Sequence, residues 1–185
     1  MTINGRNSTE RCADLVLRAF RAVPSRLRRV AFSGLSSLSY HFLSRRRLIA
    51  LSNLQRAFPE KSEAERIAIA KKVFRNMGIV ASEFFDIPYL TRENIGDLVQ
   101  AEGVEHCLKA LEKGKCVLIF GAHFGNWELE AVAVSLLVKP VVVIYRPLDS
   151  DVLDTLVMRI RSSTGNKPLP KTKAMRAMLR SLKNN

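Results

Sequence analysis

A histidine and a glutamate form the pair in this chain whose types and spacing best suit proton transfer. They are His123 and Glu128, in the stretch GAHFGNWELE at residues 121–130. A histidine can take a proton from a hydroxyl near neutral pH, and a carboxylate can hold the imidazole in the required tautomer. If a helix begins near Gly125, Glu128 is about one turn along it and can fold back to the imidazole. The spacing predicts a His–Glu dyad that works without an enzyme nucleophile.

The residues between the pair suit the same chemistry. Gly125 leaves room for a substrate close to the backbone. Asn126 either caps the helix or donates to a substrate oxygen, and the helix N-terminus favours developing negative charge. A His–Glu pair at this separation also occurs often by chance, and the stretch is then only the turn that ends a strand. The residues alone leave both interpretations open.

The surrounding pattern predicts the elements that position this pair. The apolar run CVLIF at 116–120 is typical of a strand buried on both faces, which would place Cys116 in the core. The stretch 127–138 has helical periodicity, and PVVVIYRP at 140–147 indicates a second buried strand. A strand, a helix and a strand in this order predict a parallel βαβ unit with its site at the carboxyl ends of the strands. His123 and Arg146 both fall there.

Further helices are expected on either side of this unit, so the predicted fold class is α/β. Ser62 and Glu65 have capping-box spacing and predict a helix over about 63–87. Residues 91–114 indicate a second helical stretch that ends at Gly114. Residues 151–165 form an amphipathic pattern with a glycine stop, and another helix is expected from about residue 172.

Charge is concentrated at the two ends of the chain. The net charge is +13, and residues 1–50 hold ten arginines against two acidic residues. Apolar residues lie between these arginines, and the pattern predicts an amphipathic helical region that lies in a membrane interface with these residues inward: Leu15, Phe20, Val30, Phe32 and Leu35. The longest uncharged stretch, 30–44, is too short and serine-rich to span a bilayer. A soluble helix pair with solvated arginines is the alternative.

Three segments together carry a resemblance to a known family. GAHFGNWE is similar to the His-x4-Asp/Glu motif of the lysophospholipid acyltransferase superfamily, in the form found in bacterial lipid A biosynthesis lauroyl and myristoyl acyltransferases. NLQRAFPEKSEAER at 53–66 resembles the upstream signature of that family, and YRPLDSDVLDTLVMRIRSSTGNKPLPK at 145–171 resembles its downstream segment. The three segments follow the family order.

The resemblance implies transfer of a fatty acyl group from an acyl carrier protein or acyl-CoA thioester to a hydroxyl of a lipid A precursor or similar glycolipid. His123 would be the general base and Glu128 its partner, and Arg146, Gly125 and Asn126 would contact substrate. No cofactor, metal or nucleic acid is expected. The implied location is the cytoplasmic face of the bacterial inner membrane, where the chain would meet an anionic surface.

The charge and apolar pattern predict that residues 1–50 form a basic amphipathic membrane-associating helical region. The resemblance implies that residues 51–185 are the N-terminal part of an α/β, βαβ-containing acyltransferase domain whose C-terminal strands are missing. The alternative functions are a non-catalytic basic module that binds membrane or nucleic acid, and an inactive truncated homologue of the acyltransferases.

Overall fold

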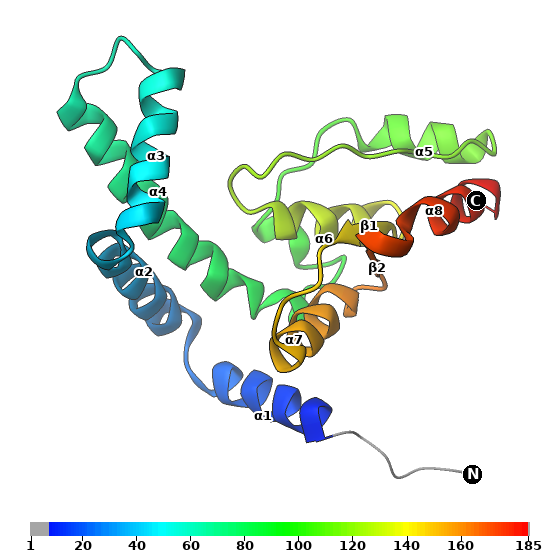
Figure 1. The fold of residues 1–185 in the computed structure, drawn as a ribbon. Coiled ribbons are helices and arrows are strands. Elements are labelled where there is room, and N and C mark those ends of the chain that lie inside the picture. The colour runs from blue at the N-terminus through cyan, green and yellow to red at the C-terminus, as the bar shows by residue number, and fades with distance from the viewer. Residues whose placement is uncertain (1–7, 185) are drawn as a thin grey trace. The chain divides into compact units, whose positions relative to one another are not determined.

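Eight α-helices form between residues 8 and 184, the part of the chain that this computed structural model describes (Figure 1). The helices are α1 (Ser8–Ala22), α2 (Ser25–Phe42), α3 (Ser44–Ala57), α4 (Glu63–Phe84), α5 (Val104–Glu112), α6 (Trp127–Leu137), α7 (Asp151–Ser162) and α8 (Ala174–Asn184). Three short 3₁₀ helices are η1 (Ile87–Tyr89), η2 (Ile95–Asp97) and η3 (Lys171–Lys173). The two strands are β1 (Val142–Tyr145) and β2 (Lys167–Pro170). The fold is mostly helical, and its α/β character is confined to a two-stranded sheet.

Residues 20–85 form one of two compact units, built around α2 and α4. These helices run antiparallel, as three contacts along their length show: Arg29 with Glu83, Phe32 with Gly78, and Ser36 with Phe74. Gly78 permits the closest approach, because a Cβ there would lie 2.3 Å from the Phe32 carbonyl oxygen. The rings of Phe20, Phe32 and Phe85 pack together at one end of the unit. The rings of Phe20 and Phe32, which are both half-buried, therefore face this cluster and not the membrane interface that the sequence predicted for them.

The start of α4 is fixed by the predicted capping box. The Ser62 hydroxyl accepts a hydrogen bond from the Glu65 amide, and the Glu65 carboxylate accepts one from the Ser62 amide at 2.8 Å. The helix ends at Phe84, close to the expected boundary.

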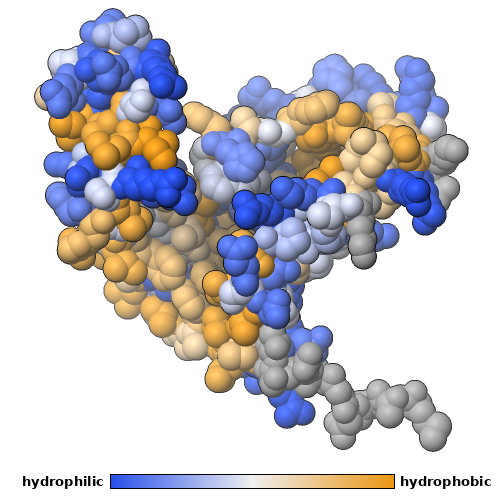
Figure 2. All heavy atoms as spheres, in the orientation of Figure 1, coloured by the Kyte–Doolittle hydropathy of each residue, from blue (hydrophilic) through white to orange (hydrophobic). Residues whose placement is uncertain are grey.

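Most of the large apolar side chains of α2 are exposed, and hydrophobic residues gather over this helix on the face shown in Figure 2.

The second unit comprises residues 8–19 and 86–184 within the described part of the chain. Its sheet consists of β1 and β2, which pair in parallel from Val142 with Lys167 to Tyr145 with Pro170. Helix α7 connects the two strands, so they form a βαβ unit one element later than the sequence predicted. Ile87, Ile95 and Ile160 are almost completely buried and belong to the core of this unit.

The predicted strand at 116–120 does not form. These residues have no regular secondary structure, the Phe120 side chain is 87% exposed, and Cys116 is exposed rather than in the core. A buried strand needs a hydrogen-bonding neighbour and cover on both faces. Within residues 8–184, β1 pairs with β2 alone, so the run at 116–120 receives neither.

The helical stretch expected at 91–114 is also broken. Only η2 and α5 form there, and Gly103 separates them with a φ of 76°. The expected stop at Gly114 is confirmed, because this residue has a φ of 66° and its amide donates to the Leu111 carbonyl. The Lys115 amide reaches back to Ala110, which completes a Schellman motif.

The described α-helices are 9 to 22 residues long. Among those of residues 8–184, none is both long and apolar enough to cross a lipid bilayer.

Candidate active site

The loop that carries His123 ends in a helix cap. The Asn126 side chain accepts a hydrogen bond from the Leu129 amide at 3.3 Å and so fixes the start of α6 at Trp127. Gly125 has a φ of 59°, a left-handed conformation that glycine adopts without steric cost. A Cβ at Gly125 would meet no atom within 4 Å, so the space beside this backbone is open. The cap is one of the two roles that the sequence allowed for Asn126, and the backbone geometry adds a second reason for the glycine.

Glu128 is held by an arginine that the sequence did not single out. The Arg161 Nε donates to one Glu128 carboxylate oxygen at 2.9 Å, and the Arg161 Nη2 donates to the other. This fork-shaped pairing fixes the carboxylate plane as well as its position. The Glu128 side chain is only 12% exposed, so the ion pair is shielded from most of the solvent. The first turn of α6 is thereby tied to the last turn of α7.

His123 lies apart from this ion pair. Its ring packs against Trp127, with ring centroids 5.1 Å apart and planes tilted by 45°. The residue is exposed, and the described contacts of His123 and Glu128 include no hydrogen bond between the two side chains. The structure therefore places both members of the predicted dyad at the N-terminal end of α6, with the imidazole on the solvent side.

Arg146 directly follows β1, in a loop that is fastened to α7. The Asp154 carboxylate accepts a hydrogen bond from the Leu148 amide at 2.9 Å. Burial raises the pKa of the Tyr145 phenol above its usual value, and the nearby charge of Asp154 raises it further. By accepting the Leu148 amide, Asp154 of α7 anchors the backbone two residues after Arg146. The Arg146 side chain is exposed and directly follows the end of a strand, as the sequence predicted for its position.

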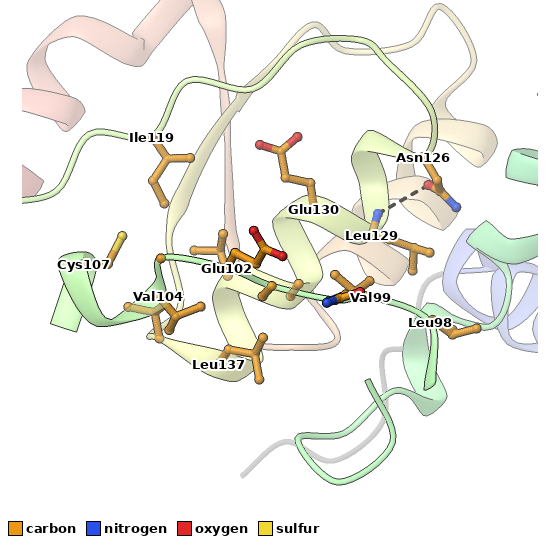
Figure 3. Close-up of a pocket in the computed structure, with 16 residues that line it drawn as sticks. Leu98, Val99, Glu102, Val104, Cys107, Ile119, Asn126, Leu129, Glu130 and Leu137 are labelled. Carbon is orange, nitrogen blue, oxygen red and sulfur yellow. Dashed lines mark hydrogen bonds between the residues drawn. The ribbon is translucent and has the colours of Figure 1, made fainter. Parts of the chain in front are cut away.

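A cavity of about 540 Å³ opens along another face of α6 (Figure 3). Leu129, Ala133 and Leu137 line it at intervals of four residues, and Val104 and Ile119 contribute from other segments. Asn126 lies at one end of this row. Glu128 does not line the cavity, because its side chain is directed toward α7. The cavity and the ion pair therefore occupy different faces of α6.

Within 8–184, no three His, Cys, Asp or Glu side chains gather as a metal site would require.

Arg161 is the residue that the sequence did not reveal. It is one of eight basic residues in the last 35 positions, and it is 33 residues from Glu128. No local spacing rule connects positions that far apart. The only available signal is its place in the last turn of an amphipathic helix after a predicted strand.

Comparison with known proteins gives a consistent match over most of the chain. Residues 13–185 match the family described as bacterial lipid A biosynthesis acyltransferase. The chain is 31% identical over 152 residues to the lipid A biosynthesis lauroyltransferase of Escherichia coli K12, covering 81% of this chain and 48% of that protein. A lipid A biosynthesis acyltransferase of Haemophilus influenzae is 34% identical over 141 residues, covering 75% and 43%.

A third relative, the lipid A biosynthesis palmitoleoyltransferase of Escherichia coli K12, is 26% identical over 149 residues. It is matched over 80% of this chain and 48% of its own length. The chain thus spans about half the length of the curated relatives it matches. The family match covers the His123 loop, the α6–α7 ion pair and the sheet, and on this basis the chain belongs to the bacterial lipid A biosynthesis acyltransferase family.

Proposed function

We propose that this chain carries part of the catalytic site of a lipid A type O-acyltransferase, with His123 as general base. The observation that carries the proposal is the fixed Glu128 carboxylate in the His-x4-Glu motif of a chain that belongs to this family. The reaction is transfer of a fatty acyl group from a thioester to a hydroxyl of a lipid A precursor or similar glycolipid. In this proposal the βαβ unit of β1, α7 and β2 is part of an acyltransferase-like α/β domain.

In the proposed step, the imidazole of His123 takes the proton of the acceptor hydroxyl. The hydroxyl oxygen then bonds to the acyl carbon, and the carbon–sulfur bond of the thioester breaks. The proton passes from the imidazolium to the leaving thiolate, so that the site returns to its starting state. The two negative partial charges that develop, on the acyl oxygen and on the sulfur, lie near the N-terminus of α6, whose amides favour them.

Glu128 orients the base in this proposal, and Arg161 holds Glu128. A carboxylate has about four acceptor positions, and the two bonds from Arg161 use only half of them. The remaining positions can accept the ring N–H of His123. The loop before α6 permits this approach, because Gly125 is open and its left-handed conformation allows the chain to turn. Arg161 is thus a positioning residue that fixes the carboxylate before the imidazole reaches it.

Three further residues would contact substrate. The exposed Arg146 guanidinium can bind a phosphate through two parallel hydrogen bonds, which suits a phosphorylated donor or acceptor. Gly125 and Asn126 would border the reacting groups, with Asn126 also serving as the helix cap. The proposal requires neither a metal nor a cofactor.

The proposed partners follow from the charge of the chain and the family. An acidic acyl carrier protein, or acyl-CoA, would donate the acyl group, and both would be attracted to a chain of net charge +13. The acceptor glycolipid lies in a membrane, so we place the chain at the cytoplasmic face of the bacterial inner membrane. Nucleic acid is not an expected partner.

Two alternatives remain as outcomes of the test. The chain could be an inactive homologue of the acyltransferases, since it spans about half of the curated relatives. It could also be a non-catalytic basic binding module, which the arginine-rich residues 1–50 would support.

The deciding experiment measures transfer of labelled acyl groups by the purified chain and by His123→Ala. Removal of a positioned base should reduce transfer by about 10²- to 10⁴-fold. His106→Ala is the matched control, because this histidine is also exposed and lies outside the motif, in α5. Circular dichroism confirms that the variants fold. Equal transfer by the wild-type chain and His123→Ala would reject the role of His123. No transfer by the wild-type chain would favour an inactive homologue.

A further inference from the structure

The face of α2 that is directed away from α4 is apolar along the whole helix. The residues of this α2 outer face are Leu27, Val30, Ala31, Gly34, Leu35, Leu38 and Phe42, and all of them are exposed. The Phe42 side chain, for example, is 75% exposed. In water a helix presents polar residues on such a face. An exposed apolar stripe of this length, about 24 Å at 1.5 Å per residue, indicates an interaction surface.

The opposite face of α2 carries serines, which reverses the usual arrangement. The hydroxyls of Ser33, Ser37 and Ser39 donate to carbonyls of α2 itself, and the Ser36 hydroxyl donates to the Phe74 carbonyl of α4 at 2.5 Å. These small side chains let α2 and α4 pack closely, and each hydroxyl has an acceptor within the protein. These four serine hydroxyls are therefore satisfied within the protein and do not need water as a hydrogen-bond partner.

The charges around the stripe identify its partner. Residues 15–59 contain nine arginines and no acidic residue. Arg26 flanks one end of α2, and Arg45 and Arg46 follow its other end, all three exposed. A second copy of the chain would bring this arginine-rich surface against itself, which like charges oppose. An anionic lipid surface offers both an apolar layer for the stripe and phosphates for the arginines.

We propose that the α2 outer face inserts into the interfacial layer of an anionic bilayer, with the helix axis parallel to the membrane plane. The arginines at both ends lie at the level of the lipid phosphates, with their aliphatic stems along the apolar boundary. The proposal deepens the membrane placement given above by naming the inserted face. It assigns Val30 and Leu35 to the membrane and leaves Phe20 and Phe32, which are half-buried against other rings, outside the inserted face.

The test is sedimentation of the intact chain with vesicles of phosphatidylglycerol and phosphatidylcholine, compared with pure phosphatidylcholine vesicles. Leu38→Glu should weaken binding to the anionic vesicles about tenfold or more, because a leucine is lost from the apolar layer and a charge enters it. Leu153→Glu is the matched control, since Leu153 is 54% exposed and Leu38 is 53% exposed. Both sites are on helix surfaces, so folding should be retained.

A second measurement reports insertion directly. Leu38→Trp should gain a blue-shifted emission component on anionic vesicles, whereas Leu153→Trp should not, with Trp127 as the common background. Equal binding of Leu38→Glu and Leu153→Glu would overturn the proposal. So would a wild-type dimer that Leu38→Glu dissociates while its vesicle binding is unchanged, because the stripe would then cover a second copy. His123→Ala should bind vesicles as the wild type does, so loss of acyl transfer and loss of membrane binding are separable.

Discussion

At the scale of single residues, the Glu128–Arg161 ion pair changes how the His-x4-Glu motif is understood. The motif suggests a histidine and a glutamate that contact each other directly. In the structure the Glu128 carboxylate is bound by Arg161 of α7. The His123 ring is exposed in the loop before α6 and packs against Trp127. Because Arg161 already fixes the Glu128 carboxylate, a hydrogen bond from the His123 imidazole would require no further ordering of the Glu128 side chain.

A double-mutant cycle tests whether this ion pair is energetically coupled. Glu128→Gln and Arg161→Gln each leave the other group without its charged partner, so each should destabilise the fold. The coupling free energy should be about 1–2 kcal/mol, less than for a fully buried pair because Arg161 is partly exposed. Urea unfolding of the four proteins, followed by circular dichroism, measures it.

The neighbouring arginine of α7 supplies the control for that cycle. Arg159 pairs with Asp14 instead of Glu128. A cycle of Glu128→Gln with Arg159→Gln should therefore give a coupling below about 0.5 kcal/mol. Equal coupling in both cycles would mean that the effect is a general change in charge, and the specific role of Arg161 would be withdrawn.

Local sequence rules were sufficient for part of the candidate site. The Asn126 cap, one of the two roles that the sequence allowed, could be predicted because it depends on residues within one helical turn. The left-handed conformation of Gly125 was not predicted, because the sequence suggested only that this glycine leaves room for a substrate. The Glu128–Arg161 contact depends on how α6 and α7 pack, which no spacing along one sequence encodes. The direct His123–Glu128 contact stays a prediction.

At the scale of elements, the start of α4 depends on Ser62 and Glu65. Hydrogen bonds from the Ser62 side chain and the Ser62 amide lower the pKa of the Glu65 carboxyl below its usual value. Because the folded pKa is depressed, this contribution to stability is present above the unfolded pKa of about 4.5 and is lost as the pH falls through the folded pKa. The cap should therefore stabilise the protein at neutral pH more than in acid.

Ser62→Ala tests the cap. Loss of the side-chain hydrogen bonds should lower the free energy of unfolding by about 1 kcal/mol at pH 7, and by less at an acidic pH below the depressed folded pKa of Glu65. Unfolding in urea at both pH values gives the comparison. Ser52→Ala is the control, because Ser52 is exposed within α3 and alanine is the better helix former there. A loss at Ser62 that is independent of pH would contradict the link to Glu65.

Gly78 sets the distance between α2 and α4, and its replacement should separate them. A Cβ at Gly78 would lie 2.3 Å from a backbone oxygen, so Gly78→Ala must shift one helix and should cost about 1–3 kcal/mol. Gly34→Ala, on the outer face of α2, meets nothing within 4 Å and should stabilise the helix by up to about 1 kcal/mol. Thermal unfolding of both variants would show opposite signs, and equal effects would argue against close packing at Gly78.

Several elements followed from periodicity because their signals are local. The helices α4, α6, α7 and α8 and the strand β1 formed near the expected residues. Periodicity could not predict that residues 116–120 lack regular structure, because an apolar run forms a strand only where another strand pairs with it. β2 was not anticipated, since Pro168 and Pro170 remove two backbone donors and disfavour a strand. Its position at the edge of the sheet accommodates both prolines.

At the scale of the whole molecule, the division suggested by charge differs from the division made by packing. The basic residues 1–50 suggested a boundary near 50, and their role in membrane association stays a prediction. The packing of α2 against α4 crosses that residue, and the compact units divide after Ala19 and after Phe85. Deleting residues 1–50 would therefore remove α2 and expose the inner face of α4. That deletion could reduce vesicle binding either because the lipid contacts of α2 are lost or because the unit no longer folds. Single substitutions on the α2 outer face separate these two causes.

The two units should also respond separately to a core substitution. Phe32 contacts Phe20 and Phe85 within residues 20–85, so Phe32→Ala should destabilise that unit by about 2 kcal/mol, less than for a fully buried phenylalanine because Phe32 is half-buried. Amide hydrogen exchange, read by mass spectrometry, should accelerate in α2 and α4 and stay unchanged in α6 and α7. Ile160→Ala in the core of the other unit should give the reverse pattern. If either substitution accelerated exchange equally in all four helices, the chain would unfold as one cooperative block, and the α2–α4 pair could not be treated as a separate membrane-binding unit.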